Sequence, residues 1–264
     1  MDKRILHLSD LHFGTTHPDL EDNLIAAING HNADIVVLSG DFTQRAYRSE
    51  FLQARAFIDQ IRAPVFVVPG NHDVIAWNVA IRFTRPFQFY KKYINKDLNP
   101  VYEDDDCIIV GINTARRVVP HWNWAHGMVS LKQIARVIAI FAVAPKEKAR
   151  ILVCHHPLIA AVNVPLKTIV WRGMALHAAL TKLNVELILT GHVHHASVTM
   201  TPYEGGQIAS IGAATATSSR LRGQPNGYNI ITIHEGEIKV ECMQWQKGAF
   251  SLLQEHTIVR RMGN

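Results

Sequence analysis

The stretch VFVVPGNHD, Val65–Asp73, is the one from which the rest of the fold can be predicted. Its apolar first half is typical of a short buried strand, and the Pro-Gly pair at residues 69 and 70 ends that strand. Asn71-His72-Asp73 then stands at the carboxyl end of the strand, which is where open α/β sheets build their sites. The stretch therefore predicts a buried strand that leads directly into a functional loop.

The same arrangement occurs four more times along the chain. Each predicted strand ends at polar side chains: Leu6–Ser9 before Asp10 and His12, Ile35–Leu38 before Asp41, Ile151–Cys154 before His155 and His156, and Leu187–Thr190 before His192, His194 and His195. Helical periodicity separates the first strands, over Asp19–Ile28 and in a helix that we expect Ser49 to cap. These βα units imply a mostly parallel central sheet.

The segment Trp77–Asn99 is aromatic and basic. We expect residues of about 77–100 either to form a cap or rim over the site or to pack as a helix on the core. Beyond it, the pattern predicts a strand over Cys107–Ile112, a helix capped by Ser130 and a helix over Gly173–Leu183.

After His195 the sequence becomes a series of short alternating runs separated by Gly, Pro and Asn. Such runs are typical of antiparallel strands joined by tight turns, with Glu235-Gly236 as one hairpin turn. The tail over Gln246–Arg261 is predicted to add a last strand, and these apolar strands leave pairing into a homodimer open.

Length and composition favour one domain with a substantial core, since the 264 residues are 48% hydrophobic. The formal charge of +5 suits an anionic substrate but is more typical of ordinary surface lysines and arginines. The three cysteines show no paired spacing, so we expect reduced core thiols. No targeting segment is visible and no stretch approaches the ~20 apolar residues of a membrane span, so we expect a cytoplasmic protein with no membrane partner.

The polar residues at the strand ends are of metal-ligand types. Carboxylate and imidazole together favour Zn, Fe or Mn. Seven such groups are too many for one tetrahedral ion, and two ions that share one carboxylate would use them all. The seven candidates are Asp10, His12, Asp41, Asn71, His155, His192 and His194.

Five motifs in order carry a resemblance to a known family: Asp10-Leu11-His12, Gly40-Asp41, Gly70–Asp73, His155-His156-Pro157 and Gly191–His194. Together they resemble the calcineurin-like metallophosphoesterases. The resemblance implies a four-layer αββα sandwich with mixed sheets, a single domain over residues 1–264, and residues 197–264 as antiparallel strands of the second sheet.

The resemblance also implies a role for each residue of the site. Asp10, His12 and His194 would hold the first metal ion and Asn71, His155 and His192 the second, while Asp41 would bridge the two. A hydroxide between the ions would attack phosphorus, and the catalytic residues would be Asp41 and His72. Asn71 and His72 would face the substrate, and His72 would assist the leaving oxygen.

The loop after Asp41 narrows the expected activity. Gln44 stands where family members that are protein phosphatases carry a second Asp, so we do not expect a protein phosphatase. The sequence resembles the bacterial class III branch, which acts on cyclic nucleotides and glycerophosphodiesters. A phosphomonoesterase, a nuclease of the same fold and a non-catalytic scaffold are the alternatives, and a nucleic acid polymer is not the expected partner.

Several further residues are left with two interpretations or with a structural one. His156 and His195 support a ligand or simply pack, and Asp73 holds its turn. Six arginines have two possible roles, contact with the far end of a substrate or a place on the solvated surface. They are Arg82, Arg85, Arg116, Arg117, Arg220 and Arg222. The residues expected to be structural are His7, His17, His31, His121 and the solvated run Asp104–Asp106.

Overall fold

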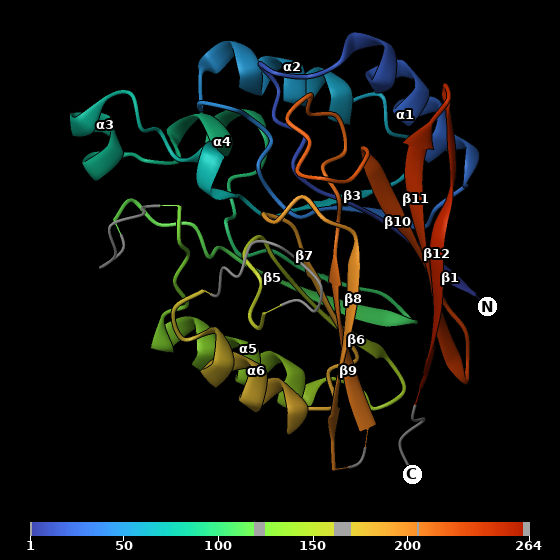
Figure 1. Ribbon diagram of the computed structural model, residues 1–264. Coiled ribbons are helices and arrows are strands. Elements are labelled where there is room, and N and C mark those ends of the chain that lie inside the picture. The colour runs from blue at the N-terminus through green and yellow to red at the C-terminus, as the bar shows by residue number, and fades with distance from the viewer. Residues whose placement is uncertain (1, 119–124, 161–169, 205, 261–264) are drawn as a thin grey trace.

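Two six-stranded sheets form the centre of the computed structural model, and helices lie outside them (Figure 1). The structure describes residues 2–118, 125–160, 170–204 and 206–260. His121 therefore lies outside the described residues.

The first sheet combines strands from the two ends of the chain. Its order is β12-β11-β10-β1-β2-β3. The strands are β1 (Lys3–Leu8), β2 (Ile35–Leu38), β3 (Val65–Val67), β10 (Gly227–Ile233), β11 (Glu237–Gln246) and β12 (Ala249–Val259). Strands β1, β2 and β3 are parallel, whereas β10 pairs with β1 in the antiparallel sense and brings the C-terminal hairpins into the same sheet.

The second sheet repeats this arrangement with the middle of the chain. Its order is β4-β5-β6-β7-β9-β8, and β5, β6, β7 and β9 are parallel. The strands are β4 (Val101–Glu103), β5 (Cys107–Ile112), β6 (Ala149–Cys154), β7 (Leu187–Thr190), β8 (Ser197–Tyr203) and β9 (Gly206–Gly212). Every residue of β5, β6 and β7 is buried, which agrees with strands covered on both faces.

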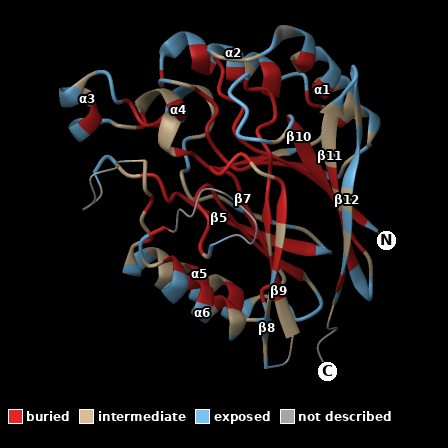
Figure 2. Ribbon diagram, in the orientation of Figure 1, coloured by how far each residue is buried: buried red, intermediate tan, exposed pale blue. Residues whose placement is uncertain are grey.

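The longer helices form the two outer layers. Helices α1 (Pro18–Gly30) and α2 (Arg48–Ile58) lie on the side of the first sheet, and α5 (Leu131–Val143) and α6 (Gly173–Thr181) lie on the side of the second (Figure 1). Buried residues concentrate between the layers (Figure 2). The core between the two sheets includes Ile5, Val37, Ile151, Leu189 and Ile231, so the expected four-layer αββα sandwich with mixed sheets is confirmed.

Sheet membership differs from the expectation in one respect. The first βα units do form one parallel set, β1-β2-β3, as expected, but of residues 197–264 only β8 and β9 join the second sheet, whereas β10, β11 and β12 join the first. Strand β10 instead pairs with β1, with Leu6 opposite Ile230. The reason is that all seven residues of β10 are buried, so its sequence shows no exposed face that distinguishes one sheet from the other.

Of the two serines predicted to cap helices, one does so and the other does not. Ser130 caps α5, since its hydroxyl accepts from the Gln133 amide at 3.2 Å. Ser49 does not cap α2, because the N-cap is Tyr47 and the Glu50 carboxylate accepts from the amides of Arg45 and Tyr47 at 2.9 and 3.1 Å. The buried Glu50 at N3 thus accepts from the amide of the N-cap residue Tyr47, as the glutamate of a capping box does.

The segment between β3 and β4 contains a 3-10 turn over Asn71–Asp73 and two short helices, α3 (Val79–Thr84) and α4 (Gln88–Tyr93). Tyr90 is fully buried, whereas Phe83 is 43% exposed. The aromatic residues of this segment therefore divide between the core and the surface. None of the described helices is long and apolar enough to cross a bilayer.

Candidate metal centre

The site lies where loops from both sheets meet at the carboxyl ends of β1, β2, β3, β6 and β7. Backbone hydrogen bonds join these loops: the amide of Asp10 donates to the carbonyl of Gly40 at 3.0 Å, and the amide of Gly191 donates to the carbonyl of His155 at 2.9 Å. Loops that follow strands distant in sequence are thereby fixed against one another before any ligand is considered.

One half of the site is formed by Asp10, His12 and His194. Each is nearly or fully buried, and their ligand atoms lie within 4.8 Å of one another. The Nε2 atom of His194 lies 3.1 Å from Oδ1 of Asp10 and 3.1 Å from Nε2 of His12. The structure therefore brings together the three residues that the sequence grouped as the first set.

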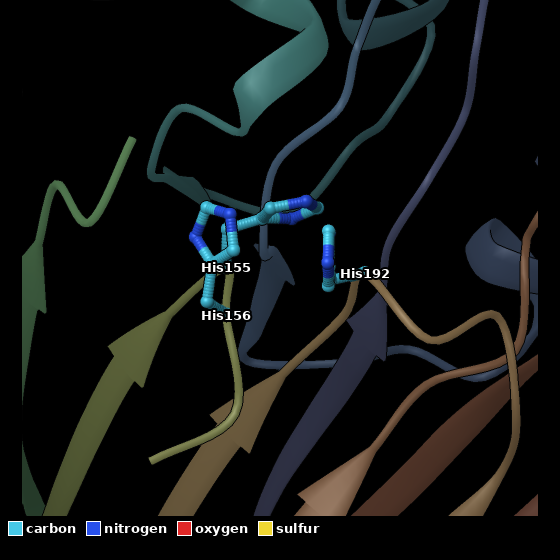
Figure 3. Close-up of side chains that lie close together, drawn as sticks. All are labelled: His155, His156 and His192. Carbon is cyan, nitrogen blue, oxygen red and sulfur yellow. The ribbon is translucent and has the colours of Figure 1, made fainter. Parts of the chain in front are cut away.

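The other half is formed by Asn71, His155 and His192. The Oδ1 atom of Asn71 lies 3.1 Å from Nε2 of His155 and 3.0 Å from Nδ1 of His192. Figure 3 shows the rings of His155 and His192 close together beyond the strand ends, with His156 beside them. The second set is thus also brought together, from β3, β6 and β7.

Asp41 lies between the two halves. Its Oδ2 atom is 3.1 Å from Nε2 of His155 and 3.8 Å from Nε2 of His12, one residue from each half. Its Oδ1 atom accepts from the backbone amide of His72 at 2.8 Å. One carboxylate oxygen is therefore held by the backbone, and the other is presented to both halves.

Asp10 is held in the same way. Its Oδ2 atom accepts from the amide of His192 at 2.9 Å, whereas its buried Oδ1 atom has no hydrogen-bond partner among the described residues. An orphaned buried carboxylate oxygen is costly, and two imidazole nitrogens lie beside it. This donor set fits a divalent or trivalent transition-metal ion, for which carboxylate and imidazole are suitable ligands.

The backbone of the site is unusual. Five of the seven candidate ligands have a positive φ: Asp10 at 56°, His12 at 50°, Asp41 at 55°, His192 at 71° and His194 at 56°. Non-glycine residues seldom adopt this left-handed conformation, and it is concentrated at functional sites. The positive φ values therefore cost conformational free energy, and they orient these side chains toward the centre of the site.

The charges of the site follow from burial and close pairing. Burial would raise the pKa of Asp41, but His155, His72 and His12 outweigh it and hold that pKa well below its ordinary value. Burial would lower the pKa of His155, but Asp41 outweighs it and raises the pKa to about 9. Burial, followed by the charge of His155, lowers the pKa of His192 to about 3.

His72 lies at the edge of this cluster. Its ring is edge-on to that of His12, with centroids 4.8 Å apart, and it is only partly buried. A ligand atom of His72 also lies within 4.8 Å of ligand atoms of His12 and Asp41. Its Nδ1 atom donates to the backbone carbonyl of Gln44 at 2.7 Å, which leaves Nε2 as the nitrogen available to a ligand.

His156 is fully hydrogen-bonded. Its Nδ1 lies 2.8 Å from the Thr114 hydroxyl, and its Nε2 lies 2.7 Å from the carbonyl of Ala125. Its ring packs on that of His192 with centroids 4.5 Å apart. Both ring nitrogens of His156 thus have hydrogen-bond partners, and its ring packs against the rings of His155 and His192. The stretch Asn113–Arg116 resembles the bacterial small-phosphodiester branch of the family, but that resemblance assigned Thr114 no role of its own.

The remaining expectations concern residues around the site. Asp73 accepts from the amides of Thr43 and Gly70 at 3.1 and 2.8 Å, so it holds the turn as expected. His7 is buried with Nε2 at 2.9 Å from the Ser39 hydroxyl. His195 has Nε2 at 3.0 Å from Nε2 of the Gln224 side chain and lies away from the ligand cluster.

Comparison with known proteins gives consistent findings. A model of the family described as calcineurin-like phosphoesterase matches residues 3–196. The chain is 26% identical over 222 residues to the glycerophosphodiester phosphodiesterase GpdQ of Enterobacter lignolyticus, covering 79% of this chain and 76% of that protein. It is 26% identical over 208 residues to the 3',5'-cyclic adenosine monophosphate phosphodiesterase CpdA of Escherichia coli K12, covering 72% and 69%.

Solved structures resemble the fold. A purple acid phosphatase from yellow lupin superposes with a TM-score of 0.74 at 14% identity, covering 98% of this chain and 54% of that one, so the chain spans about half of the lupin protein. A dimetal phosphatase from Danio rerio gives a TM-score of 0.70 at 13% identity and covers 97% and 98%. At these identities the likeness concerns the fold alone.

Proposed function

The chain belongs to the calcineurin-like phosphoesterase family, and we propose that it hydrolyses a small phosphodiester at the junction of its two sheets. It is a metal-dependent phosphoester hydrolase. The observation that carries the proposal is the position of Asp41, whose free oxygen lies between His12 of one ligand set and His155 of the other. A carboxylate shared between two such sets is suited to a pair of neighbouring ions.

We assign the ligands of the two ions from the family resemblance, and these distances support the assignment. Asp10, His12 and His194 would hold one ion, Asn71, His155 and His192 would hold the other, and Asp41 would be available to both. Mn, Fe and Zn all suit this mixture of ligands. When bound, the ions supply Lewis-acid charge for the attack of water on phosphorus.

The protein's own groups prepare the site for that charge. The amides of His72 and His192 fix one oxygen of Asp41 and Asp10, respectively, so each carboxylate presents its other oxygen without having to reorganise. Groups that are already oriented lower the reorganisation required as charge develops on the phosphoryl oxygens.

His72 acts on the leaving group. Because Nδ1 donates to the carbonyl of Gln44, the ring is fixed and Nε2 is the nitrogen that meets the substrate. A protonated Nε2 gives its proton to the departing alkoxide, which is the general-acid step of the reaction. Asn71 precedes His72 in the same turn and faces the phosphate group of the substrate.

Support for a diester substrate comes from the relatives that match most of the chain. One is described as a glycerophosphodiester phosphodiesterase and the other as a cyclic adenosine monophosphate phosphodiesterase. Both cleave small diesters, and Gln44 occupies the position at which protein phosphatases of the family carry an acid. We therefore propose a small phosphodiester rather than a phosphoprotein.

The test is hydrolysis of bis(p-nitrophenyl) phosphate by protein loaded with Mn²⁺. We expect turnover that chelation abolishes and that Mn²⁺ restores, with p-nitrophenyl phosphate as the monoester comparison. Cyclic adenosine monophosphate and glycerophosphocholine extend the panel to natural diesters. Absence of diester hydrolysis with Mn²⁺, Fe²⁺, Zn²⁺ and Co²⁺ alike would contradict the proposal.

A further inference from the structure

A cavity of about 180 Å³ opens beside the ligand cluster. His12, His72 and His194 form one wall, and Arg220 and Arg222 form the other. The first wall belongs to the proposed reaction centre, so a substituent of a bound diester enters this cavity. The second wall comes from the loop between β9 and β10, which no motif of the sequence marked as functional.

We propose that Arg220 and Arg222 form a subsite for a second anionic group, carried by one substituent of the phosphodiester. This inference rests on the proposed function and specifies its substrate. The class is a phosphodiester in which one small substituent ends in a carboxylate or a phosphate.

The two guanidinium groups are available for such a ligand. Within the part of the chain that the structure describes, the Arg220 side chain has no hydrogen bond or ion pair, and its backbone amide alone is bound, to the Ser218 hydroxyl at 3.1 Å. Arg222 makes one long contact, from Nη1 to the carbonyl of His192 at 3.4 Å. Arginines that face a cavity without a carboxylate partner are suited to bidentate binding of an external carboxylate or phosphate.

The loop that carries the arginines is anchored on both sides. The Ser219 hydroxyl donates to the carbonyl of Thr15 at 2.8 Å, and the Asn226 amide side chain donates to the carbonyl of Ser218 at 2.9 Å. Thr15 belongs to the loop that follows His12. The backbone on which the guanidinium groups stand is therefore fixed relative to the ligand cluster, which lowers the entropic cost of binding.

The size of the cavity limits the substituent. Pockets for drug-sized ligands occupy roughly 300–1,000 Å³, whereas this cavity has about 180 Å³. A short chain with a charged end suits a cavity of this size better than a bulky group does. Size and charge together thus favour a small acidic substituent over a nucleobase.

The experiment compares two chromogenic diesters of similar shape. The probes are 2-carboxyethyl p-nitrophenyl phosphate, which carries the second anion, and propyl p-nitrophenyl phosphate, which does not. We expect the wild-type kcat/KM to be about 10-fold higher for the carboxyethyl ester, mainly through KM, which is the range for a charge-assisted hydrogen bond. The preference should shrink as salt is raised, because partly exposed charges are screened.

Variants separate recognition from folding. Arg220→Gln combined with Arg222→Gln should abolish the preference while the propyl ester is cleaved as in wild type, and the corresponding Lys variants should retain part of it. Arg62→Gln, at an exposed arginine before β3, is the matched control and should change neither ester. Equal kcat/KM for both esters in the wild type, or a preference that survives the double Gln variant, would overturn the subsite.

The same experiment distinguishes the two levels of the proposal. Hydrolysis of bis(p-nitrophenyl) phosphate and of the propyl ester without a carboxyethyl preference leaves the phosphodiesterase in place and removes the subsite. Hydrolysis of no diester at all removes both.

Discussion

The Nδ1 atom of His72 lies 2.7 Å from the backbone carbonyl oxygen of Gln44. A carbonyl accepts only, so Nδ1 carries the proton and the other ring nitrogen faces the cavity beside the ligand cluster. Because the acceptor belongs to the backbone, the orientation of this ring does not depend on the side chain at position 44. Replacement of the His72 side chain should therefore impair turnover, whereas replacement of the Gln44 side chain should not.

His72→Ala should lower kcat about 10²- to 10⁴-fold, the usual contribution of a positioned acid. Metal content should remain that of the wild type, because the proposed ligands are other residues. Turnover of bis(p-nitrophenyl) phosphate and metal analysis of the same samples measure both quantities. Gln44→Ala is the control and should stay near wild-type kcat. Unchanged turnover in His72→Ala would remove the residue from the mechanism, and lost metal would make it a ligand.

Metal stoichiometry should report the two halves separately. His194→Ala and His192→Ala should each lose about one of the two ions, because each removes a ligand from one half only. Asp41→Ala should lose more, since its Oδ2 lies close to a histidine of each half. Elemental analysis after dialysis against metal-free buffer gives the counts. A single ion in the wild type, or identical losses in all three variants, would contradict the assignment.

Chelation should destabilise the protein by a defined amount. Without cations, the buried carboxylates of Asp10 and Asp41 lie close together, and neighbouring histidines such as His12 and His155 offset their charge. Added Mn²⁺ at one hundred times its dissociation constant should restore about 2.7 kcal/mol of stability for each ion bound. Thermal melting with and without Mn²⁺ measures the effect. His194→Ala should show a smaller increase in Tm, and an increase equal to that of the wild type would argue against binding at this half.

The strand positions could be predicted from the sequence because each core strand is an uninterrupted apolar run that ends at Gly, Pro or a polar loop. The run Cys107–Ile112 was predicted as a strand and is one, with all its residues buried. Sheet membership could not be predicted, since the partner of β1 is β10, more than two hundred positions away along the chain. Burial on both faces leaves no periodicity from which the partner can be deduced.

The candidate ligands could be predicted because their residue types recur at strand ends, but their orientation could not. Asp10, His12 and Asp41 adopt left-handed backbone conformations that depend on hydrogen bonds between loops, such as the amide of His12 donating to the carbonyl of Asp41 at 3.0 Å. Arg220 was one of six arginines for which substrate contact and solvated surface were both left open, because its place beside the cavity results from the anchoring of its loop against residues near His12.

A contact between the sheets predicts a pH-dependent change in stability. Lys3 of β1 pairs with Asp104 in the turn between β4 and β5, and Asp104 also accepts from the Tyr102 hydroxyl at 2.7 Å. Burial would raise the pKa of Asp104, but these hydrogen bonds outweigh it and hold the pKa below the ordinary 3.8. The sequence predicted that the run Asp104–Asp106 is solvated, and for the paired Asp104 this prediction is wrong.

Asp104→Asn should cost about 1 kcal/mol at pH 7, the upper end of the range for surface ion pairs, because this pair is partly buried. A depressed folded-state pKa stabilises the fold above the unfolded value and loses that effect as pH falls. The difference between wild type and Asp104→Asn should therefore be constant at neutral pH and shrink below about pH 4. Urea unfolding at pH 7 and pH 3 measures it, with the exposed Asp105→Asn as control. A difference that grows on acidification would contradict the assignment.

Gly191 should tolerate no side chain, because it packs against Ser9 and Asp10, and Asp10 is a proposed ligand. A Cβ at this position would lie 1.8 Å from the Ser9 hydroxyl and 2.5 Å from Oδ2 of Asp10. That oxygen is the one that the His192 amide holds in place, so a displaced carboxylate would also move its free Oδ1 away from His194.

We therefore expect Gly191→Ala to cost about 1–3 kcal/mol through overpacking and to lower both metal content and turnover. Gly236→Ala is the matched control, since a Cβ at Gly236 in the turn between β10 and β11 meets nothing within 4 Å and should leave all three quantities unchanged. Circular dichroism, metal analysis and diester hydrolysis on the two variants test the contrast. A Gly191→Ala protein with wild-type metal content and turnover would show that the geometry of Asp10 does not depend on this close contact, and so would weaken its assignment as a preorganised ligand.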